Sequence, residues 1–217
     1  MKIYYQDTEI VVVEKVYGVS SQESNGENMI SLLKNELGGE IYCVHRLDTQ
    51  TTGVMVYAKT KEASAFLSRE IASGKMHKEY LAVCHGKTEE YQKMVDLLYH
   101  DKLKNKTFVV NKKRGGTKEA ILELWTQGEG KYKEKELSLV KILLHTGRTH
   151  QIRAQLSSKG NPLYGDGKYG AKDNDKIALH CYKIGFNHPN GKSMTFISLP
   201  NGGVWDEFSD RFPNEQI

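Results

Sequence analysis

The sequence predicts an α+β fold in one domain, with a mostly antiparallel or mixed β-sheet. Segments rich in β-branched and aromatic residues outnumber those with helical periodicity, and they follow one another in consecutive pairs. The chain has 217 residues, of which 38% are hydrophobic and 27% are charged, which is typical of a globular domain with its own core. The longest apolar runs, such as Ile10–Val13, are too short to span a membrane.

Nine segments are expected to be strands, because each is short, rich in Val, Ile, Leu, Tyr or Phe, and bounded by turn-forming or charged residues. In chain order they are residues 3–5, 9–14, 41–45, 54–59, 78–83, 118–125, 137–144, 179–186 and 195–199. Two connections between them are informative. Residues 46–52 are too polar for a core and predict a loop, and the charged residues 128–136 predict the loop of a hairpin.

Three segments are expected to be helices. Residues 28–37 place apolar side chains on one helical face, residues 61–73 follow Thr60 as a suitable N-cap, and residues 149–158 begin the third helix. A glycine that ends the helix lies just beyond each one: Gly38, Gly74 and Gly160.

Positive charge is concentrated in the middle of the chain. The formal net charge is only +4, but the segment from Lys75 to Lys118 has eleven Lys or Arg against five Asp or Glu. Such a segment suits binding to a polyanion such as nucleic acid, with Lys102, Lys104 and Lys112 as candidate contacts. On charge alone, a solvated lysine-rich surface is the simpler explanation.

The first motif, HRLDTQTTG, covers His45–Gly53 and joins two predicted strands. Polar groups on a loop between rigid strands are a common layout for an active site. The alternative is a polar turn in which Asp48 caps its own backbone.

The second motif, GRTHQIRAQLSSKGNPLYGDGKYG, covers Gly147–Gly170. It places His150 and Arg153 on one helix face, and it lacks the spacing of a nucleotide-binding Walker loop. The chain has 25 Lys but six Arg, and three of those six lie in the two motifs. Arginine suits a site where a planar fork must meet a carboxylate, a phosphate or a base. An ordinary basic amphipathic helix is the alternative explanation.

The cysteines and histidines do not indicate a metal site or a disulfide framework. Cys43, Cys84 and Cys181 are odd in number and widely spaced, which favours a reducing cytoplasm. Each lies close to a histidine, but no array with metal-ligand spacing exists. We therefore expect no metal.

Together the motifs resemble the RluA-like family of RNA pseudouridine synthases. HRLDTQTTG is similar to the family's HRLDxxTSG signature, with Thr52 in the usual place of Ser, and GRTHQIR through GDGKYG is similar to its third motif. KEYLAV at residues 78–83 resembles the family's KxYxAxV strand, EKVYGV its opening KPxG element, and LHCYKIGFNHPNGKSMTF its closing strands. The resemblance covers about residues 3–200.

The resemblance implies the pseudouridine synthase catalytic fold, with flanking helices and a central RNA-binding cleft, and a cofactor-independent isomerase. By position, Asp48 is the catalytic aspartate and Arg153 is the arginine that pairs with it and keeps the carboxylate charged and oriented. Tyr80 is the tyrosine that stacks on the target uracil near its proton-transfer step, whereas without the resemblance it is a buried strand tyrosine. Arg46 enters the RNA stack as the uridine leaves. Further RNA contacts are expected at His45, Thr52, Arg148 and His150.

Two residues depart from the family pattern. Val16 stands at the usual Pro, and Gln155 stands where His is common. Residues 1–217 are expected to form a single catalytic domain, without the small N-terminal RNA-binding domain of many relatives. We expect a cytoplasmic monomer, with ribosomal large-subunit RNA and tRNA both open as substrates.

Two other functions compete with the isomerase. A non-catalytic RNA-binding module is disfavoured by the intact Asp48, Tyr80 and Arg153. A nucleoside or glycoside hydrolase that uses Asp48 needs a second carboxylic acid. Asp166 is the only acid in the second motif, and its Gly-Asp-Gly setting is more typical of a turn.

Overall fold

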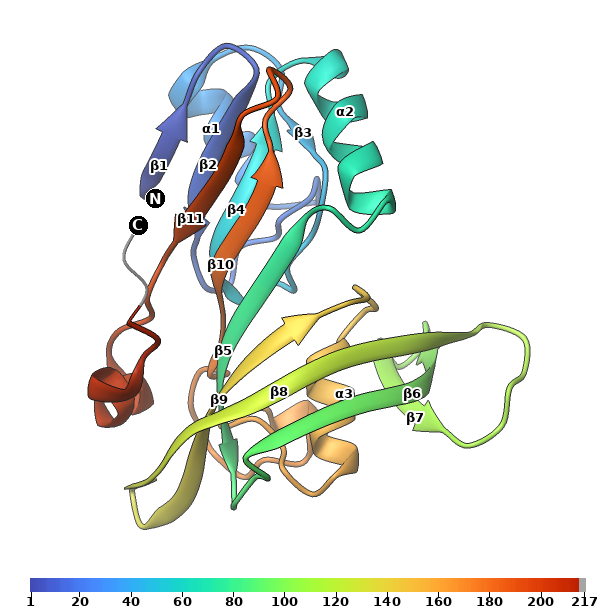
Figure 1. Cartoon of the computed structure of the whole chain (residues 1–217), viewed down its shortest axis with the longest axis vertical. Coiled ribbons are helices and arrows are strands. Elements are labelled where there is room, and N and C mark those ends of the chain that lie inside the picture. The colour runs from blue at the N-terminus through green and yellow to red at the C-terminus, as the bar shows by residue number, and fades with distance from the viewer. Residues whose placement is uncertain (215–217) are drawn as a thin grey trace. The chain divides into compact units, whose positions relative to one another are not determined.

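The computed structural model describes residues 1–214, and its contacts divide the chain into two compact units. The first unit contains residues 1–78 and 180–199, and the second contains residues 79–179 and the C-terminal segment from Pro200. Figure 1 shows the helices and strands of both units. In the described part of the chain, no helix is long and apolar enough to cross a membrane.

The first unit is built on a mixed sheet. The strands pair in the order β1-β2-β4-β10, with β3 beside β4 and β11 beside β10. Their bounds are Ile3–Gln6 (β1), Ile10–Lys15 (β2), Tyr42–Cys43 (β3), Thr52–Ala58 (β4), Leu179–Asn187 (β10) and Ser193–Ile197 (β11). β4 and β10 are parallel, whereas the β1–β2, β2–β4, β3–β4 and β10–β11 pairs are antiparallel. The predicted mixture of strand directions is confirmed.

Two helices, α1 (Met29–Leu37) and α2 (Lys61–Ala72), complete the first unit. Thr60 caps α2 as predicted, because its hydroxyl accepts from the Ala63 amide. Helix α1 begins one residue later than predicted, because Asn28 is its N-cap and forms a capping box with Ser31. The core runs along β2 and β4, where every residue of Ile10–Val13 and Val54–Ala58 is completely buried.

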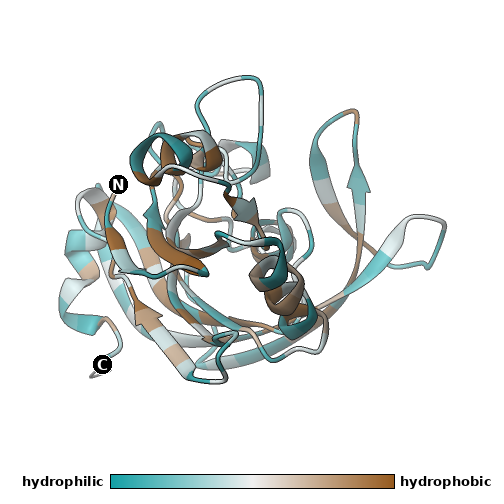
Figure 2. Cartoon of the chain, turned by 90° about the horizontal axis from the view of Figure 1, so that it is seen from above, coloured by the Kyte–Doolittle hydropathy of each residue, from teal (hydrophilic) through white to brown (hydrophobic). Residues whose placement is uncertain are grey.

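The second unit contains a five-stranded antiparallel sheet in the order β5-β9-β8-β6-β7. The strands are His77–His85 (β5), Tyr91–Asp101 (β6), Lys106–Val110 (β7), Thr117–Tyr132 (β8) and Lys135–Leu144 (β9). Helix α3 (Gln151–Ser158) and two 3₁₀ segments, Gly167–Tyr169 (η1) and Gly203–Arg211 (η2), accompany this sheet. A buried cluster of Leu98, Ala120, Ala154 and Tyr169 joins β6, β8, α3 and η1. In Figure 2 the hydrophobic residues lie mainly in strands and helices, and hydrophilic residues occur in strands and helices as well as in the connecting loops.

The second unit corrects the sequence prediction in two places. The charged residues 128–136 are mostly strand, because β8 and β9 continue to a two-residue turn at Lys133 and Glu134, both with positive φ. β6 and β7 were not predicted at all. In β6 only Met94 and Leu98 are fully buried, four residues apart, so the sequence lacks the alternation that identifies a half-buried strand.

Candidate active site

The Asp48 loop, residues 44–51, connects β3 to β4 in the first unit. Leu47 is buried and anchors it, and the Ser21 hydroxyl donates to the Leu47 carbonyl at 2.9 Å. The neighbours on either side point outward: Arg46 is exposed and Asp48 is half-buried. The Asp48 carbonyl accepts from the Thr51 amide at 2.9 Å, so the backbone turns directly after the aspartate.

Lys15, which the sequence analysis did not single out, holds this loop from β2. Its side chain is completely buried, and its ammonium donates to the carbonyls of Thr49 at 3.0 Å and Thr51 at 2.7 Å, and to that of Val16 at 3.1 Å. Burial lowers the pKa of Lys15 to about 8, and the negative charge of Asp48 opposes that shift. Lys15 therefore positions the backbone around Asp48 and supplies a positive charge close to its carboxylate.

We expect Lys15→Met to lower the free energy of unfolding by about 2 kcal/mol, because a buried carbonyl that loses its donor costs about 1–3 kcal/mol and removing a costly buried charge offsets part of the loss. Urea denaturation measures the change. Lys61→Met, which removes an exposed lysine at the start of α2, is the matched control and should stay within about 0.5 kcal/mol of the wild type. A Lys15→Met protein with wild-type stability and activity would contradict the positioning role.

His45 and Thr52 support the loop from inside the unit. His45 is 8% exposed, its Nε2 accepts from the Val56 amide at 3.2 Å, and burial lowers the pKa of its imidazole well below the usual value. The Thr52 hydroxyl donates to Nδ1 of His180 at 2.7 Å, since Nε2 of that ring donates to the Ser198 carbonyl at 3.0 Å. The structure gives both residues an internal role, so neither is among the RNA contacts that we propose below.

Gly53 ends the first motif for a steric reason. Its φ is +118°, and a Cβ atom there would lie 2.2 Å from the Cys181 carbonyl oxygen. Cys181 is the residue paired with Gly53 in the parallel β4–β10 ladder. Only glycine allows this close approach, which brings the end of the Asp48 loop against β10.

In the second unit, Arg153 lies on α3 and forms a buried ion pair with Asp166. Nε donates to one carboxylate oxygen at 2.7 Å and Nη2 donates to the other at 2.8 Å. Asp166 is completely buried, the Arg153 side chain is 4% exposed, and its guanidinium lies 5.1 Å from the centre of the Tyr169 ring. This bidentate contact fixes the plane of the guanidinium.

The interpretation of Asp166 as a turn residue is confirmed, and the structure adds an ion pair that the sequence analysis did not predict. Asp166 does lie in a turn before η1, but its side chain makes no capping hydrogen bond and binds Arg153 instead. Arg153 and Asp166 are 13 residues apart, so no helical or strand periodicity in the sequence relates them. The presence of an arginine and an aspartate in the same long motif is the feature of the sequence from which this ion pair could have been predicted.

His150 and Gln155, on either side of Arg153, also face the interior. His150 is 9% exposed and accepts a hydrogen bond at Nδ1 from the Tyr169 hydroxyl at 3.1 Å, since that hydroxyl itself accepts from the Thr107 amide. Gln155, which departs from the family pattern, is completely buried and donates to Asp96 at 2.7 Å. The structure thus gives His150 a packing role, and we propose no RNA contact for it.

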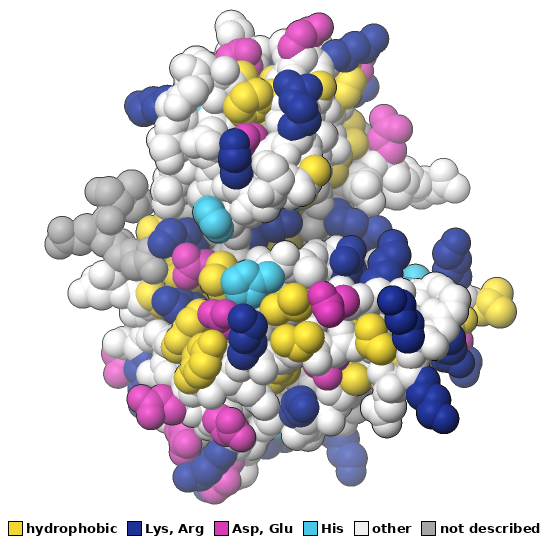
Figure 3. All heavy atoms as spheres, turned by 45° about the vertical axis from the view of Figure 1, so that its right-hand side comes forward, with side chains coloured by type: hydrophobic (Ala, Val, Ile, Leu, Met, Phe, Trp, Pro, Cys, Tyr) yellow, Lys and Arg dark blue, Asp and Glu magenta, His cyan; other side chains and the backbone are white. Residues whose placement is uncertain are grey.

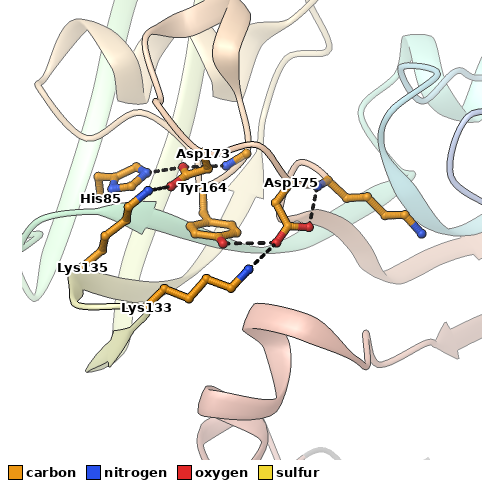
Figure 4. Close-up of polar contacts among 8 residues, drawn as sticks. His85, Lys133, Lys135, Tyr164, Asp173 and Asp175 are labelled. Carbon is orange, nitrogen blue, oxygen red and sulfur yellow. Dashed lines mark hydrogen bonds and ion pairs between the residues drawn. The ribbon is translucent and has the colours of Figure 1, made fainter.

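The segment after Asp166 is fastened by a network of side chains, drawn in Figure 4. Asp173 accepts from the Gly165 amide at 3.0 Å, from Nε2 of His85 at 2.6 Å, and from the Lys135 ammonium. A Cβ atom at Gly165 would lie 2.2 Å from the Lys176 carbonyl oxygen, so the chain folds back tightly on itself. Asp173 therefore fixes the backbone next to Asp166, and through it the plane of Arg153.

Asp173→Asn should lower the free energy of unfolding at pH 7 by about 1–3 kcal/mol, because an amide cannot accept from all three donors. The Gly165, Lys135 and His85 contacts hold the pKa of Asp173 below its usual value despite burial. A carboxyl group whose pKa is lower in the folded state stabilises fully above about pH 4, and that stabilisation is lost as the pH falls through the folded-state pKa.

The difference between Asp173→Asn and the wild type should therefore shrink below pH 4, as measured by urea denaturation across pH. Asp210→Asn is the control, since that side chain is 75% exposed and lies outside this network. Equal stability of Asp173→Asn and wild type at pH 7 would contradict the fastening role.

Tyr80 lies on β5 in the second unit, opposite Ile142 of β9, and is 5% exposed. The predicted basic contacts are at the surface: Lys102 and Lys104 in the β6–β7 turn, Lys112 after β7, and Arg148 before α3. Figure 3 shows many Lys and Arg side chains at the surface in view, together with Asp and Glu side chains. The structure thus presents Asp48 and Arg46 within the first unit, and Tyr80, Arg153 and the basic residues within the second.

No group of three or more His, Cys, Asp or Glu side chains within residues 1–214 is placed to hold a metal ion. The three cysteines are free thiols. The site chemistry that the described residues offer is one carboxylate on a well-anchored loop, one rigidly oriented guanidinium and one buried phenol.

Comparison with known proteins gives the family. The family model described as RNA pseudouridylate synthase matches residues 9–158. The chain is 33% identical to an uncharacterized RNA pseudouridine synthase of Aquifex aeolicus (strain VF5), over 90% of this chain and 68% of that protein. It is 28% identical to ribosomal large subunit pseudouridine synthase C of Buchnera aphidicola subsp. Acyrthosiphon pisum (strain APS), over 92% of this chain and 67% of that protein. This chain thus spans about two thirds of the length of these two relatives.

A relative of nearer length and a solved structure agree with this result. The chain is 29% identical to dual-specificity RNA pseudouridine synthase RluA of Vibrio vulnificus (strain CMCP6), over 92% of this chain and 82% of that protein. The structure of human RNA pseudouridylate synthase domain containing 1 superposes with a TM-score of 0.80 at 22% identity, over 92% of this chain and 83% of that chain, which confirms the fold. With its two motifs and the matches along its length, the chain belongs to the RluA-like family of RNA pseudouridine synthases.

Proposed function

We propose that this chain isomerises specific uridines in structured RNA to pseudouridine. The observation that carries the proposal is the family match over residues 9–158, which includes the Asp48 loop and Arg153. The name of the Buchnera relative makes ribosomal large-subunit RNA the first candidate substrate, and tRNA remains the second. Site choice depends on RNA shape and loop contacts.

The reaction explains the need for a carboxylate. The bond between uracil N1 and the sugar C1′ breaks, the uracil turns, and a bond forms between C5 and C1′; the proton on C5 leaves and N1 takes up a proton, so that the product is an isomer of the substrate. Asp48 attacks or electrostatically stabilises C1′ while the base is detached. A loop held by Lys15 keeps the carboxylate oriented throughout, since its flanking carbonyls are bound to the buried ammonium.

Three other residues have proposed roles. Asp166 fixes the plane of the Arg153 guanidinium, and we propose that Arg153 keeps the Asp48 carboxylate charged and oriented. Tyr80 stacks on the target uracil near the proton-transfer step. The exposed Arg46 enters the RNA stack when the uridine flips out. We further propose a monomer in the cytoplasm that needs no cofactor or metal and binds its RNA in a central cleft of a single catalytic domain.

Asp166 bears on the hydrolase alternative. A hydrolase that uses Asp48 needs a second carboxylic acid, and Asp166 is the only acid in the second motif. Both Asp166 oxygens accept hydrogen bonds from Arg153, and the side chain is completely buried. This environment suits a fixed acceptor and disfavours a general acid, so the isomerase is the better proposal.

The test is tritium release from RNA labelled at uracil C5, followed by nucleoside analysis. Isomerisation gives tritium release and pseudouridine, hydrolysis gives free uracil, and a binding module gives neither. Mapping pseudouridines in total RNA from cells with and without the gene then identifies the substrate. Release of free uracil without pseudouridine would overturn the proposal.

The basic surface is expected to supply electrostatic binding to RNA. Reversing the charge at Lys102, Lys104 and Lys112 should flatten the plot of log affinity against log salt by about 2 units, because each phosphate contact contributes about 0.7 on single-stranded RNA. The slope is measured by fluorescence anisotropy titrations of labelled RNA at salt concentrations between about 50 and 300 mM. Charge reversal at the exposed Lys131 and Lys159 is the control. An unchanged slope in the triple variant would mean that these lysines form a solvated surface that does not contact RNA.

A further inference from the structure

The second unit contains a pocket of about 750 Å³ between the β6–β7 turn and the segment that leads into α3. The end of β6, the turn after it, residues 115–118 and residues 147–149 form its walls. None of the proposed catalytic residues lines it. Three exposed cationic side chains do: Lys102, Lys118 and Arg148.

An aromatic ring forms one side of the pocket. Tyr99 is half-buried, and the guanidinium carbon of Arg114 lies 4.3 Å from the centre of its ring. A Cβ atom at Gly116 would be only 3.6 Å from the same ring, so the loop packs closely on its edge. Bases stack on aromatic rings, and Tyr99 presents such a ring to the pocket, whereas Arg114 lies over the same ring without lining the pocket.

One of these three cations, Arg148, is held in place before any ligand binds. Nε of Arg148 donates to the Glu119 carbonyl at 3.0 Å, and the Arg148 amide donates to the Gln151 side chain at 3.0 Å. The one acid in the lining, Asp101, accepts from the Lys104 amide in the turn. Because cationic walls surround an aromatic side, the pocket suits a group that is both anionic and flat.

We propose that this pocket binds one nucleotide of the substrate RNA other than the target uridine, with its base on Tyr99 and its phosphate among Lys102, Lys118 and Arg148. The proposal rests on the proposed function for the identity of the polymer. The pocket shares residues 147–149 with the start of α3, which carries Arg153, so occupancy stabilises the segment that positions the proposed catalytic arginine. The pocket thereby contributes to the choice of uridine.

The test measures binding of a fluorescein-labelled single-stranded 12-mer of oligouridylate to the full chain at fixed salt. Tyr99→Ala and Arg148→Ala should each raise Kd about ten-fold, the size expected for one lost stack or one lost phosphate contact. Tyr99→Phe should bind like the wild type, because stacking does not need the hydroxyl. The matched controls are Tyr91→Ala, on the same strand and 48% exposed, and Lys159→Ala, which removes one exposed charge; both should stay within about two-fold.

Photo-crosslinking gives an independent readout. RNA with 5-iodouridine at single positions should crosslink to the peptide that contains Tyr99 from a position beside the modified uridine, whereas a crosslink from the modified uridine itself would overturn the proposal. Wild-type binding by both Tyr99→Ala and Arg148→Ala would also overturn it. Arg148 is exposed, so its variant stays informative if Tyr99→Ala fails to fold. If the wild type forms no pseudouridine in any RNA while the pocket variants still lose affinity, the proposed function fails and the pocket proposal stands.

Discussion

Asp48→Asn should lower the single-turnover rate of pseudouridine formation by three orders of magnitude or more, about 4 kcal/mol of transition-state stabilisation. The amide has nearly the same shape as the carboxylate but cannot attack or stabilise the anomeric carbon as an anion. The fold should be preserved, because the turn at Asp48 uses its backbone carbonyl and the loop is held by Lys15 and by buried Leu47. Tritium release under saturating enzyme measures the rate without contributions from binding.

The control for this experiment is Asp210→Asn, which makes the same chemical change at an exposed position of η2. It should retain wild-type activity, and both variants should bind RNA with wild-type affinity. Substantial turnover by a well-folded Asp48→Asn protein would mean that the aspartate serves only the turn, and the proposed mechanism would then be wrong.

Breaking the Arg153–Asp166 pair should have the second-largest effect. Arg153→Lys retains the positive charge but not the planar fork that now meets both oxygens of Asp166. Asp166→Asn retains the shape but leaves the guanidinium beside a neutral partner. Removing one member of a buried ion pair costs about 3–5 kcal/mol of stability, and we expect each variant to lose at least 100-fold in single-turnover rate, about 3 kcal/mol.

Urea denaturation and single-turnover tritium release separate the two effects. The double variant Arg153→Lys/Asp166→Asn should be less destabilised than the sum of the single variants, because the two residues interact directly. Arg69→Lys, on the exposed face of α2, is the matched control and should behave like the wild type. If Arg153→Lys keeps the wild-type rate, the fork is not needed, and a phosphate contact becomes the better account of this arginine.

Elements whose signals are local were predictable from the sequence. The starts of α1 and α2 follow from Asn28 and Thr60, whose side chains cap the next turn of backbone. The Asp48 loop was predicted because its residues are too polar for a core. The loop predicted at residues 128–136 was too long, because the turn consists of Lys133 and Glu134 alone; both have positive φ, a conformation more typical of Gly or Asn.

The family, the strand-rich fold class and the candidate residues Asp48, Tyr80 and Arg153 could be predicted from the sequence alone, because they depend on motifs that are contiguous along the chain. The residues that support them are apparent only in the folded protein. Lys15 reaches a loop more than thirty residues away, and Asp166 reaches Arg153 across thirteen. Such contacts depend on how strands and turns pack. These hydrogen bonds and ion pairs are strong because they are buried, and the burial of these polar side chains cannot be predicted from periodicity in the sequence.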